Sequence, residues 1–303
     1  MATFSLTAIN VGTYPLGEAD RIITFFSRER GLHRAVAKGA RKPGTRLSGK
    51  SEPLNINRML LARGRSLDII TQCESIETFG ALRRNLERLA FALYYAELTQ
   101  VFGPGLSEDA ARYFDRLSLS VGLMAESARE PALLCLEFEF ALLEMLGIRP
   151  QLDRCVACRE PLNEQTISSF NHEMGGLLCQ PCHRLMRRRA VNHDSARPLR
   201  VQEDESGEYA RDLELAVGNI GHRDDIDGQR ATVLITPLVW KRLVLARASS
   251  ETLNEGLTST ILAEQEIATV QNKSIHAARR LMQGYIEYKA GKRMRALDLL
   301  ANI

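Results

Sequence analysis

The stretch CVACREPLNEQTISSFNHEMGGLLCQPC, residues 155–182, contains two Cys-x-x-Cys pairs, Cys155/Cys158 and Cys179/Cys182, separated by twenty residues. A Cys-x-x-Cys turn places both sulfurs on one side of a tight bend, so two turns supply the four corners of a tetrahedron. Thiolates at this spacing favour Zn²⁺. The stretch therefore predicts a zinc ribbon that spans residues 152–185.

The role expected for this zinc is structural. Four protein sulfurs close the coordination sphere and leave no position for water or substrate. Two disulfides or a redox pair are the alternative, but they suit a short secreted chain and this one has 303 residues. His172 and His183 flank the second pair, yet four thiolates already suffice as ligands.

The rest of the chain has the composition of a globular protein, with 45% hydrophobic and 25% charged residues. Cys73 and Cys135 lie in apolar runs and are expected to be small buried residues. The most apolar segment, residues 132–146, is interrupted by three glutamates, which favours a buried helix over a membrane span. The N-terminus shows no signal-peptide pattern, so we expect a cytoplasmic protein.

The first eighty residues alternate like short β-strands. Apolar runs occur at residues 4–11, 22–26, 32–37 and 54–61, and a fifth begins at residue 67 after the polar turn at 63–66. Five short strands in this length are typical of a small closed barrel, so we expect an oligonucleotide-binding (OB) fold over residues 1–79. Phe4, Tyr14, Phe25 and Phe26 are either aromatic platforms for bases or core residues.

The remainder, residues 80–303, is expected to be an all-α domain with the zinc ribbon inserted in it. Leu82, Leu86, Leu89 and Leu93 recur at helical spacing, which predicts a helix with these leucines in the core. Further helices are expected from an N-cap at Ser107, from Pro131 to Gly147, from Pro237, and around Leu281, Tyr285 and Tyr288.

An acidic, mobile insertion is expected at about residues 192–231. The segment 203–227 holds nine acidic and two basic residues, for a net charge of −7. Its high charge and low hydrophobicity disfavour a packed core.

Positive charge gathers in the predicted barrel, although the whole chain has a net charge of only +3. Residues 28–50 carry eight basic residues and one acidic residue. Such clustering favours a polyanion as partner, although a basic cluster is often just a solvated face. The candidate DNA-binding residues are Arg28, Arg30, Arg34, Lys38, Arg41, Lys42, Arg46 and Lys50.

One motif in this basic stretch imitates an ATP-binding loop. The letters GTRLSGKS, residues 44–51, match the phosphate-binding loop consensus. That loop must connect a buried strand directly to a helix, but here Pro43 precedes it and Glu52-Pro53 and an alternating run follow. We therefore interpret it as a loop between strands, and no hydrolase or deaminase motif appears elsewhere in the sequence.

Together these features resemble the RecO family of recombination mediators and DNA-repair proteins. The resemblance is carried by KGARK (38–42), KSEP (50–53), GGLLC (175–179) and GYIEYKAGKR (284–293), in the order strand-rich, helical, ribbon, last helix. It covers nearly the whole chain. The long acidic insertion departs from the family pattern, so no pocket for the tail of single-stranded DNA-binding protein (SSB) is assigned.

The resemblance implies a non-enzymatic protein with an N-terminal OB barrel and a helical domain that carries the ribbon. It implies binding to single- and double-stranded DNA, annealing of complementary strands, and cooperation with RecR in loading RecA onto SSB-coated strands, in the cytoplasm at the nucleoid. Two alternatives stay open from the residues alone, an RNA-binding module and a zinc-stabilised protein-interaction scaffold.

Overall fold

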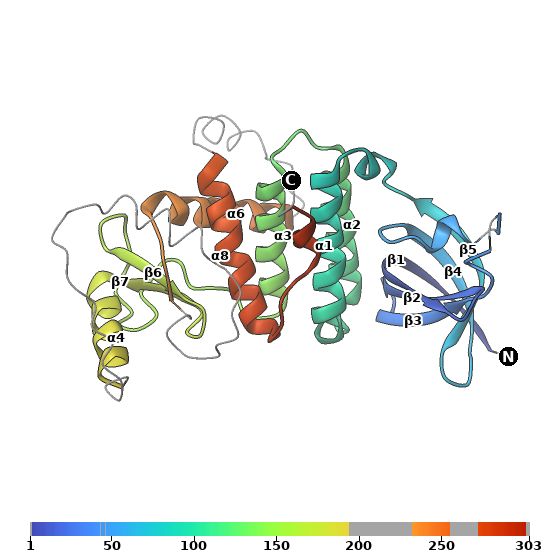
Figure 1. Cartoon of the computed structure of the whole chain (residues 1–303), viewed down its shortest axis with the longest axis horizontal. Helices are drawn as coiled ribbons and strands as arrows, with labels where there is room; N and C mark the ends of the chain where they lie inside the picture. The colour runs from blue at the N-terminus through green and yellow to red at the C-terminus, as the bar shows by residue number, and fades with distance from the viewer. Residues whose placement is uncertain (1, 43, 46, 194–231, 255–271, 301–303) are drawn as a thin grey trace. The chain divides into compact units, whose positions relative to one another are not determined.

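The computed structural model describes residues 2–42, 44–45, 47–193, 232–254 and 272–300 (Figure 1). The expected insertion at residues 192–231 lies almost entirely outside them. The chain forms two compact units, each described by itself below. Unit 1 comprises residues 1–147, 250–258 and 290–303, and unit 2 comprises residues 148–249 and 259–289.

Unit 1 begins with a closed five-stranded barrel in the order β1-β2-β3-β5-β4, the arrangement of an OB fold. Its strands are β1 (Thr3–Leu16), β2 (Asp20–Ser27), β3 (Gly31–Ala37), β4 (Ile56–Ala62) and β5 (Asp68–Glu77). All neighbours pair antiparallel except β3 and β5, which are parallel and meet only at Ala35↔Asp68 and Val36↔Ile69. The predicted OB-like barrel is confirmed.

Alternation along the strands fills the barrel with apolar side chains. The buried cluster inside it consists of Leu6, Ala8, Ile23, Phe25, Ala35, Ala37, Ala40, Met59, Leu61 and Ile70. The strand β1 interrupts its alternation with a bulge between Asn10 and Gly12. A bulge moves all later side chains of a strand to the opposite face, so the two halves of β1 present different faces to the barrel interior.

Helices α1 (Leu86–Phe102), α2 (Ala110–Glu126) and α3 (Pro131–Met145) follow the barrel, with short 3₁₀ helices η2 (Gly80–Arg84) and η3 (Gly103–Leu106) between elements. The barrel packs on them through contacts such as Phe26 against Tyr113 of α2, an edge-on pair with ring centroids 4.9 Å apart. At the C-terminal end of unit 1, Glu97 of α1 accepts hydrogen bonds from the amides of Arg295 and Ala296 at the start of η4 (Ala296–Leu300).

Two sequence predictions in this region were wrong. Leu86 is 53% exposed at the first position of α1. The helix begins there because the Asn85 side chain caps it by accepting from the Arg88 amide. Leu82 is buried in η2 as predicted and Leu89 and Leu93 are half-buried, so only Leu86 departs from the series. The fully buried face of α1 includes Phe91, Tyr94, Tyr95 and Leu98. Ser107 does not cap α2, which begins three residues later, and its hydroxyl donates to the Pro104 carbonyl instead.

Helix α3 is apolar around its whole circumference, as its central position in unit 1 requires. Its two central glutamates, Glu137 and Glu139, are 1% and 0% exposed. Each has a partner, because Arg129 forms an ion pair with Glu137 and the Tyr94 hydroxyl donates to Glu139. These bonds allow carboxylates to stand in an otherwise apolar helix.

Unit 2 contains a three-stranded sheet in the order β7-β6-β8 and the helices around it. Its elements are β6 (Ile167–Asn171), β7 (Gly176–Cys179), α4 (Gln180–His193), β8 (Thr232–Leu234), α6 (Pro237–Asn254), whose last turn belongs to unit 1, and α8 (Asn272–Ala290). Trp240 of α6 donates to the Leu152 carbonyl, and the Tyr285 hydroxyl of α8 donates to the Ile148 carbonyl. Both helices thus hold the segment that leads into the ribbon. The predicted helix start near Pro237 and the predicted helix that carries Leu281, Tyr285 and Tyr288 are confirmed.

Candidate metal centre and nucleic-acid surface

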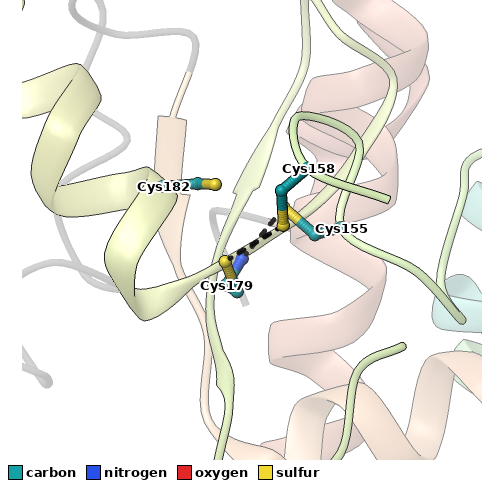
Figure 2. A group of neighbouring side chains, drawn as sticks. All are labelled: Cys155, Cys158, Cys179 and Cys182. Atoms are coloured by element: carbon teal, nitrogen blue, oxygen red, sulfur yellow. Dashed lines mark hydrogen bonds between the residues drawn. The ribbon is translucent and has the colours of Figure 1, made fainter. Parts of the chain in front are cut away.

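The four cysteine side chains of unit 2 converge on one point (Figure 2). Their sulfurs all lie within 4.8 Å of one another, and those of Cys158 and Cys179 are 3.7 Å apart. A tetrahedral zinc with Zn–S bonds of about 2.3 Å requires sulfurs about 3.8 Å apart. In the part of the chain that the structure describes, this is the one group of three or more metal-ligating side chains.

Local backbone geometry explains how each pair forms its half of the site. Cys155 and Cys158 lie in a tight knuckle, in which the Arg159 amide donates to the Cys155 carbonyl and the Cys155 amide donates to Glu160. Arg159 takes a left-handed conformation, with φ of 67°, to turn the chain back. The second pair spans the end of β7 and the first turn of α4, so that a strand and a helix each supply one sulfur.

The surroundings favour thiolate at one cysteine and oppose it at two others. Burial opposes ionisation of Cys155, but hydrogen bonds from the amides of Cys158, Cys179 and Ala157 outweigh it and lower the pKa of this thiol to about 6. Burial and the neighbouring sulfurs raise the pKa of Cys179 and of Cys182. Four thiolates at this separation need a cation between them, and the donor set therefore fits a Zn²⁺ ion.

Neither flanking histidine belongs to the sulfur cluster. The Nδ1 atom of His183 lies 2.7 Å from the Ser168 hydroxyl. His172 is buried among Phe170, Tyr285 and Tyr288, with ring centroids 5.5 to 6.4 Å apart. The two histidines are therefore packing and hydrogen-bonding residues of unit 2.

The eight basic residues proposed from the sequence lie at different places on the barrel. Arg28 and Arg30 lie in the β2–β3 turn, where Arg28 pairs with Asp115 and the Arg30 guanidinium lies over the Phe4 ring, 4.1 Å from its centroid. Arg34 is exposed on β3, and Lys38, Arg41 and Lys42 are exposed just beyond its end. Lys50 is half-buried and donates to the Cys73 carbonyl, whereas Arg46 lies outside the described residues.

The stretch that imitates an ATP-binding loop has a different structure. It runs from the loop after β3 into the 3₁₀ helix η1 (Gly49–Ser51) and on to β4, so no α-helix receives it. Arg21 donates to the Ser51 hydroxyl at 2.8 Å, and Lys50 is held by the strand β5. Its lysine and serine stabilise the barrel, in agreement with the sequence interpretation.

The sequence left open which aromatic residues of the barrel are buried and which are exposed, and the structure separates the two groups. Phe25 and Phe26 are fully buried, and Phe4 is half-buried under Arg30. Tyr14 is 44% exposed and its hydroxyl donates to Gln100 of α1 at 2.8 Å. The contact that holds Tyr14 in its exposed position is with Gln100, which is distant in the sequence. Strand alternation alone therefore could not separate Tyr14 from the core aromatics.

No helix in the described ranges is long and apolar enough to cross a lipid bilayer. The apolar helix α3 is the nearest case, and it is buried in unit 1.

Comparison with known proteins gives two family matches that run in sequence along the chain. Residues 1–79 match the model described as Recombination protein O N terminal, and residues 83–200 match Recombination protein O C terminal. Among curated proteins, the DNA repair protein RecO of Pelotomaculum thermopropionicum is 37% identical over 185 residues, covering 60% of this chain and 69% of that protein. The DNA repair protein RecO of Dehalococcoides mccartyi is 32% identical over 224 residues, covering 71% and 87%.

The relative from Synechococcus sp. (strain JA-2-3B'a(2-13)), also named DNA repair protein RecO, is 37% identical over 211 residues and covers 66% of this chain and 73% of its own length. Both matched segments coincide with structure seen here, since the first covers the five-stranded barrel and the second includes α1–α3 and the cysteine cluster. The chain therefore belongs to the RecO family of DNA repair proteins.

Proposed function

We propose that this protein is a DNA-binding recombination mediator that binds single- and double-stranded DNA, anneals complementary strands and helps to load recombinase onto SSB-coated strands. The observation that carries the proposal is the exposed basic surface of the barrel. Among the described residues, Arg34, Lys38 and Lys42 have no carboxylate partner, so their charges are available to phosphates.

Annealing by such a surface needs no covalent chemistry. Two DNA strands repel each other, and a basic surface that neutralises both allows them to approach. Each phosphate contacted releases counterions, so binding and annealing weaken steeply as salt rises. The contacts expected of Arg34, Lys38, Arg41 and Lys42 are to phosphates, which carry no sequence preference.

We assign the zinc a structural role, and we place RecR, SSB and, indirectly, RecA among the partners, with the protein in the cytoplasm at the nucleoid. The closed set of four sulfurs supports the zinc assignment, since it leaves no open coordination position. Membership of the RecO family supports the proposal of these partners.

The experiment that tests this function is annealing of complementary oligonucleotides pre-coated with SSB, with and without the protein, across a salt series and without ATP. Acceleration that falls with salt is expected. If the folded, zinc-loaded protein gives no acceleration, the mediator function is wrong, and matched DNA and RNA competitors then separate an RNA-binding module from a protein-interaction scaffold.

The residue assignment has its own test, the double charge reversal Arg41→Glu/Lys42→Glu. We expect weaker binding to both DNA forms and a shallower salt dependence, because two phosphate contacts become repulsive. The matched control is Arg83→Glu/Arg84→Glu, the same charge change on exposed residues of η2. Equal affinity of the Arg41/Lys42 variant and the control would remove the basic loop from the DNA surface.

A further inference from the structure

The outer face of the three-stranded sheet β1–β2–β3 carries an apolar patch beside basic residues. Tyr14 pairs with Ile22 and Leu16 with Asp20 across β1–β2, and Ile22 pairs with Val36 across β2–β3. Tyr14 and Leu16 are 44% and 39% exposed, while Ile22 and Val36 are half-buried. Because paired residues share one face of a sheet, Tyr14, Ile22 and Val36 form one row on the outside of the barrel.

The bulge in β1 is what brings Tyr14 to this face. Before the bulge, Ala8 points into the barrel core, and strict alternation would send Tyr14 into the core as well. The register shift between Asn10 and Gly12 reverses the alternation, so Tyr14 pairs with Ile22 and shares its outer face of the sheet. A bulge that re-aims a side chain is a feature often found at binding sites.

Gln100 of α1 holds both the bulge and the tyrosine. Its Nε2 donates to the carbonyl of Val11, the residue at the bulge, at 2.6 Å, and its Oε1 accepts from the Tyr14 hydroxyl at 2.8 Å. Gly12 makes room for this amide, since a Cβ there would come within 3.0 Å of Oε1. The ring of an exposed tyrosine is thereby fixed in one orientation, which lowers the entropy lost when a ligand packs on it.

Positive charge lies beside this ring. The Arg34 guanidinium is 6.0 Å from the Tyr14 ring centroid, and Lys38 is exposed one residue beyond β3. In the described ranges neither cation has a carboxylate partner. A fixed aromatic ring next to unpaired cations has the chemistry of a site that stacks a base and holds the phosphate next to it.

We propose that Tyr14 stacks on an unpaired base of single-stranded DNA, and that Gln100 is the positioning residue that orients the Tyr14 ring for it. This inference rests on the proposed DNA binding and deepens it, because it makes one residue distinguish single strands from duplexes. Bases in a duplex are already stacked on their neighbours and cannot pack on Tyr14, whereas both DNA forms present phosphates to Arg34 and Lys38.

The test compares affinities for a single-stranded oligonucleotide and a blunt duplex at one salt concentration, for the wild-type protein and for Tyr14→Ala, Tyr14→Phe and Gln100→Met. Loss of one base stack predicts an affinity for the single strand lower by about 5- to 150-fold in Tyr14→Ala, with duplex affinity nearly unchanged. Tyr14→Phe keeps the ring and loses only the bond to Gln100, so it should be affected less.

A second readout isolates the positioning role of Gln100. An oligonucleotide that contains 2-aminopurine reports stacking by a fall in its fluorescence. Gln100→Met should lessen this fall and weaken single-strand binding in the Tyr14 protein, and should add nothing in the Tyr14→Ala protein. A general structural effect of Gln100→Met would appear in both backgrounds and on both DNA forms.

The outcomes separate this inference from the function beneath it. If the wild-type protein binds neither DNA form, the proposed function fails, and the stacking site fails with it. If the wild-type protein binds both and Tyr14→Ala weakens both equally or neither, only the stacking site is wrong. Selective loss on the single strand, with the 2-aminopurine signal lost in parallel, supports it.

Discussion

The barrel of unit 1 and the ribbon of unit 2 are stabilised in different ways. The barrel encloses a continuous apolar cluster in which Phe25, Met59 and Leu61 are fully buried. The ribbon contributes two short strands, β6 of five residues and β7 of four, to a three-stranded sheet, and its four cysteine sulfurs lie together. Burial of apolar area drives the folding of the first. The second has little apolar area to bury, and under the zinc proposal its stability would come from coordination bonds to sulfurs of a strand, a helix and a knuckle.

This difference explains what each region can expose. A barrel that is stable through its interior can carry unpaired cations and an exposed tyrosine outside, at Arg34, Lys38 and Tyr14, without losing its fold. Under the zinc proposal, the ribbon would use its four cysteines for its own stability. The two regions should therefore respond oppositely to changes in metal and in the barrel core.

The largest effect is expected from removing the metal. Cys155→Ser, or chelation of the wild-type protein, should cost on the order of 10 kcal/mol in the folding of the ribbon segment. Circular dichroism and zinc content measured together should show partial unfolding with zinc loss, while duplex DNA affinity stays within about twofold because the barrel needs no metal.

Cys73→Ser is the matched control. Cys73 is a half-buried thiol of β5, outside the sulfur cluster, and burial raises its pKa to about 11. This variant should keep its zinc. If Cys155→Ser abolished DNA binding while unit 1 stayed folded, the ribbon would itself contact DNA.

The converse change lies in the barrel core. Phe25→Ala should destabilise the barrel by about 3–5 kcal/mol, because it leaves a cavity in a fully buried cluster. DNA binding should weaken as the barrel opens, with one zinc per chain retained. The matched variant in unit 2 is Phe170→Ala, a fully buried phenylalanine of β6, which should weaken zinc retention and leave the DNA affinity intact. A loss of zinc in Phe25→Ala would show that the two regions fold as one.

Much of the fold of both regions could be predicted from the sequence. Strand alternation predicted the five strands of the barrel. The Cys-x-x-Cys spacing predicted a cluster of four cysteines, and their sulfurs lie within 4.8 Å of one another. Both signals are local, since each depends on residues a few positions apart. The roles of zinc and of the basic residues in binding stay predictions.

The rest depends on contacts between distant residues. The leucine series has helical spacing, but Leu86 is 53% exposed, whereas Tyr94, which donates to the buried Glu139, is fully buried. Tyr14 lies 86 residues from Gln100, and nothing near Tyr14 in the sequence reveals the bulge or the amide that holds it. Periodicity predicts elements, and tertiary bonds then select the exposed side chains.

A smaller effect is expected from the buried histidine of unit 2. His172 is packed against Phe170, Tyr285 and Tyr288, and a Cβ on Gly284 would lie 3.1 Å from its ring. In the described part of the chain its Nε2 has no hydrogen-bond partner, and burial lowers its pKa to about 4. Charging this ring in place is therefore unfavourable.

Stability should consequently fall with acid. The unfolded protein binds a proton at His172 near the ordinary histidine pKa of about 6.5, and the folded protein does so only at about 4. The contribution is thus fully present above about pH 6.5 and is lost as pH falls to about 4, a change of at most about 3 kcal/mol. Urea unfolding from pH 7 to pH 4.5 measures it. His172→Phe removes the titrating group while both proteins keep their cysteines, so an identical pH dependence in the two would contradict this role.

The smallest effect is expected at the edge of the basic surface, where Arg28 pairs with Asp115 at 2.9 Å with both side chains more than half exposed. An exposed pair contributes less than about 1 kcal/mol, so Asp115→Asn should hardly change the melting temperature. It should tighten DNA binding by about twofold and steepen the salt dependence, because Arg28 is freed and a charge that repels phosphate is removed. Glu126→Gln makes the same charge change on an exposed residue at the other end of α2. A gain confined to Asp115→Asn assigns Arg28 a phosphate contact, whereas equal gains in the two variants would reflect net charge alone and exclude Arg28 from the DNA surface.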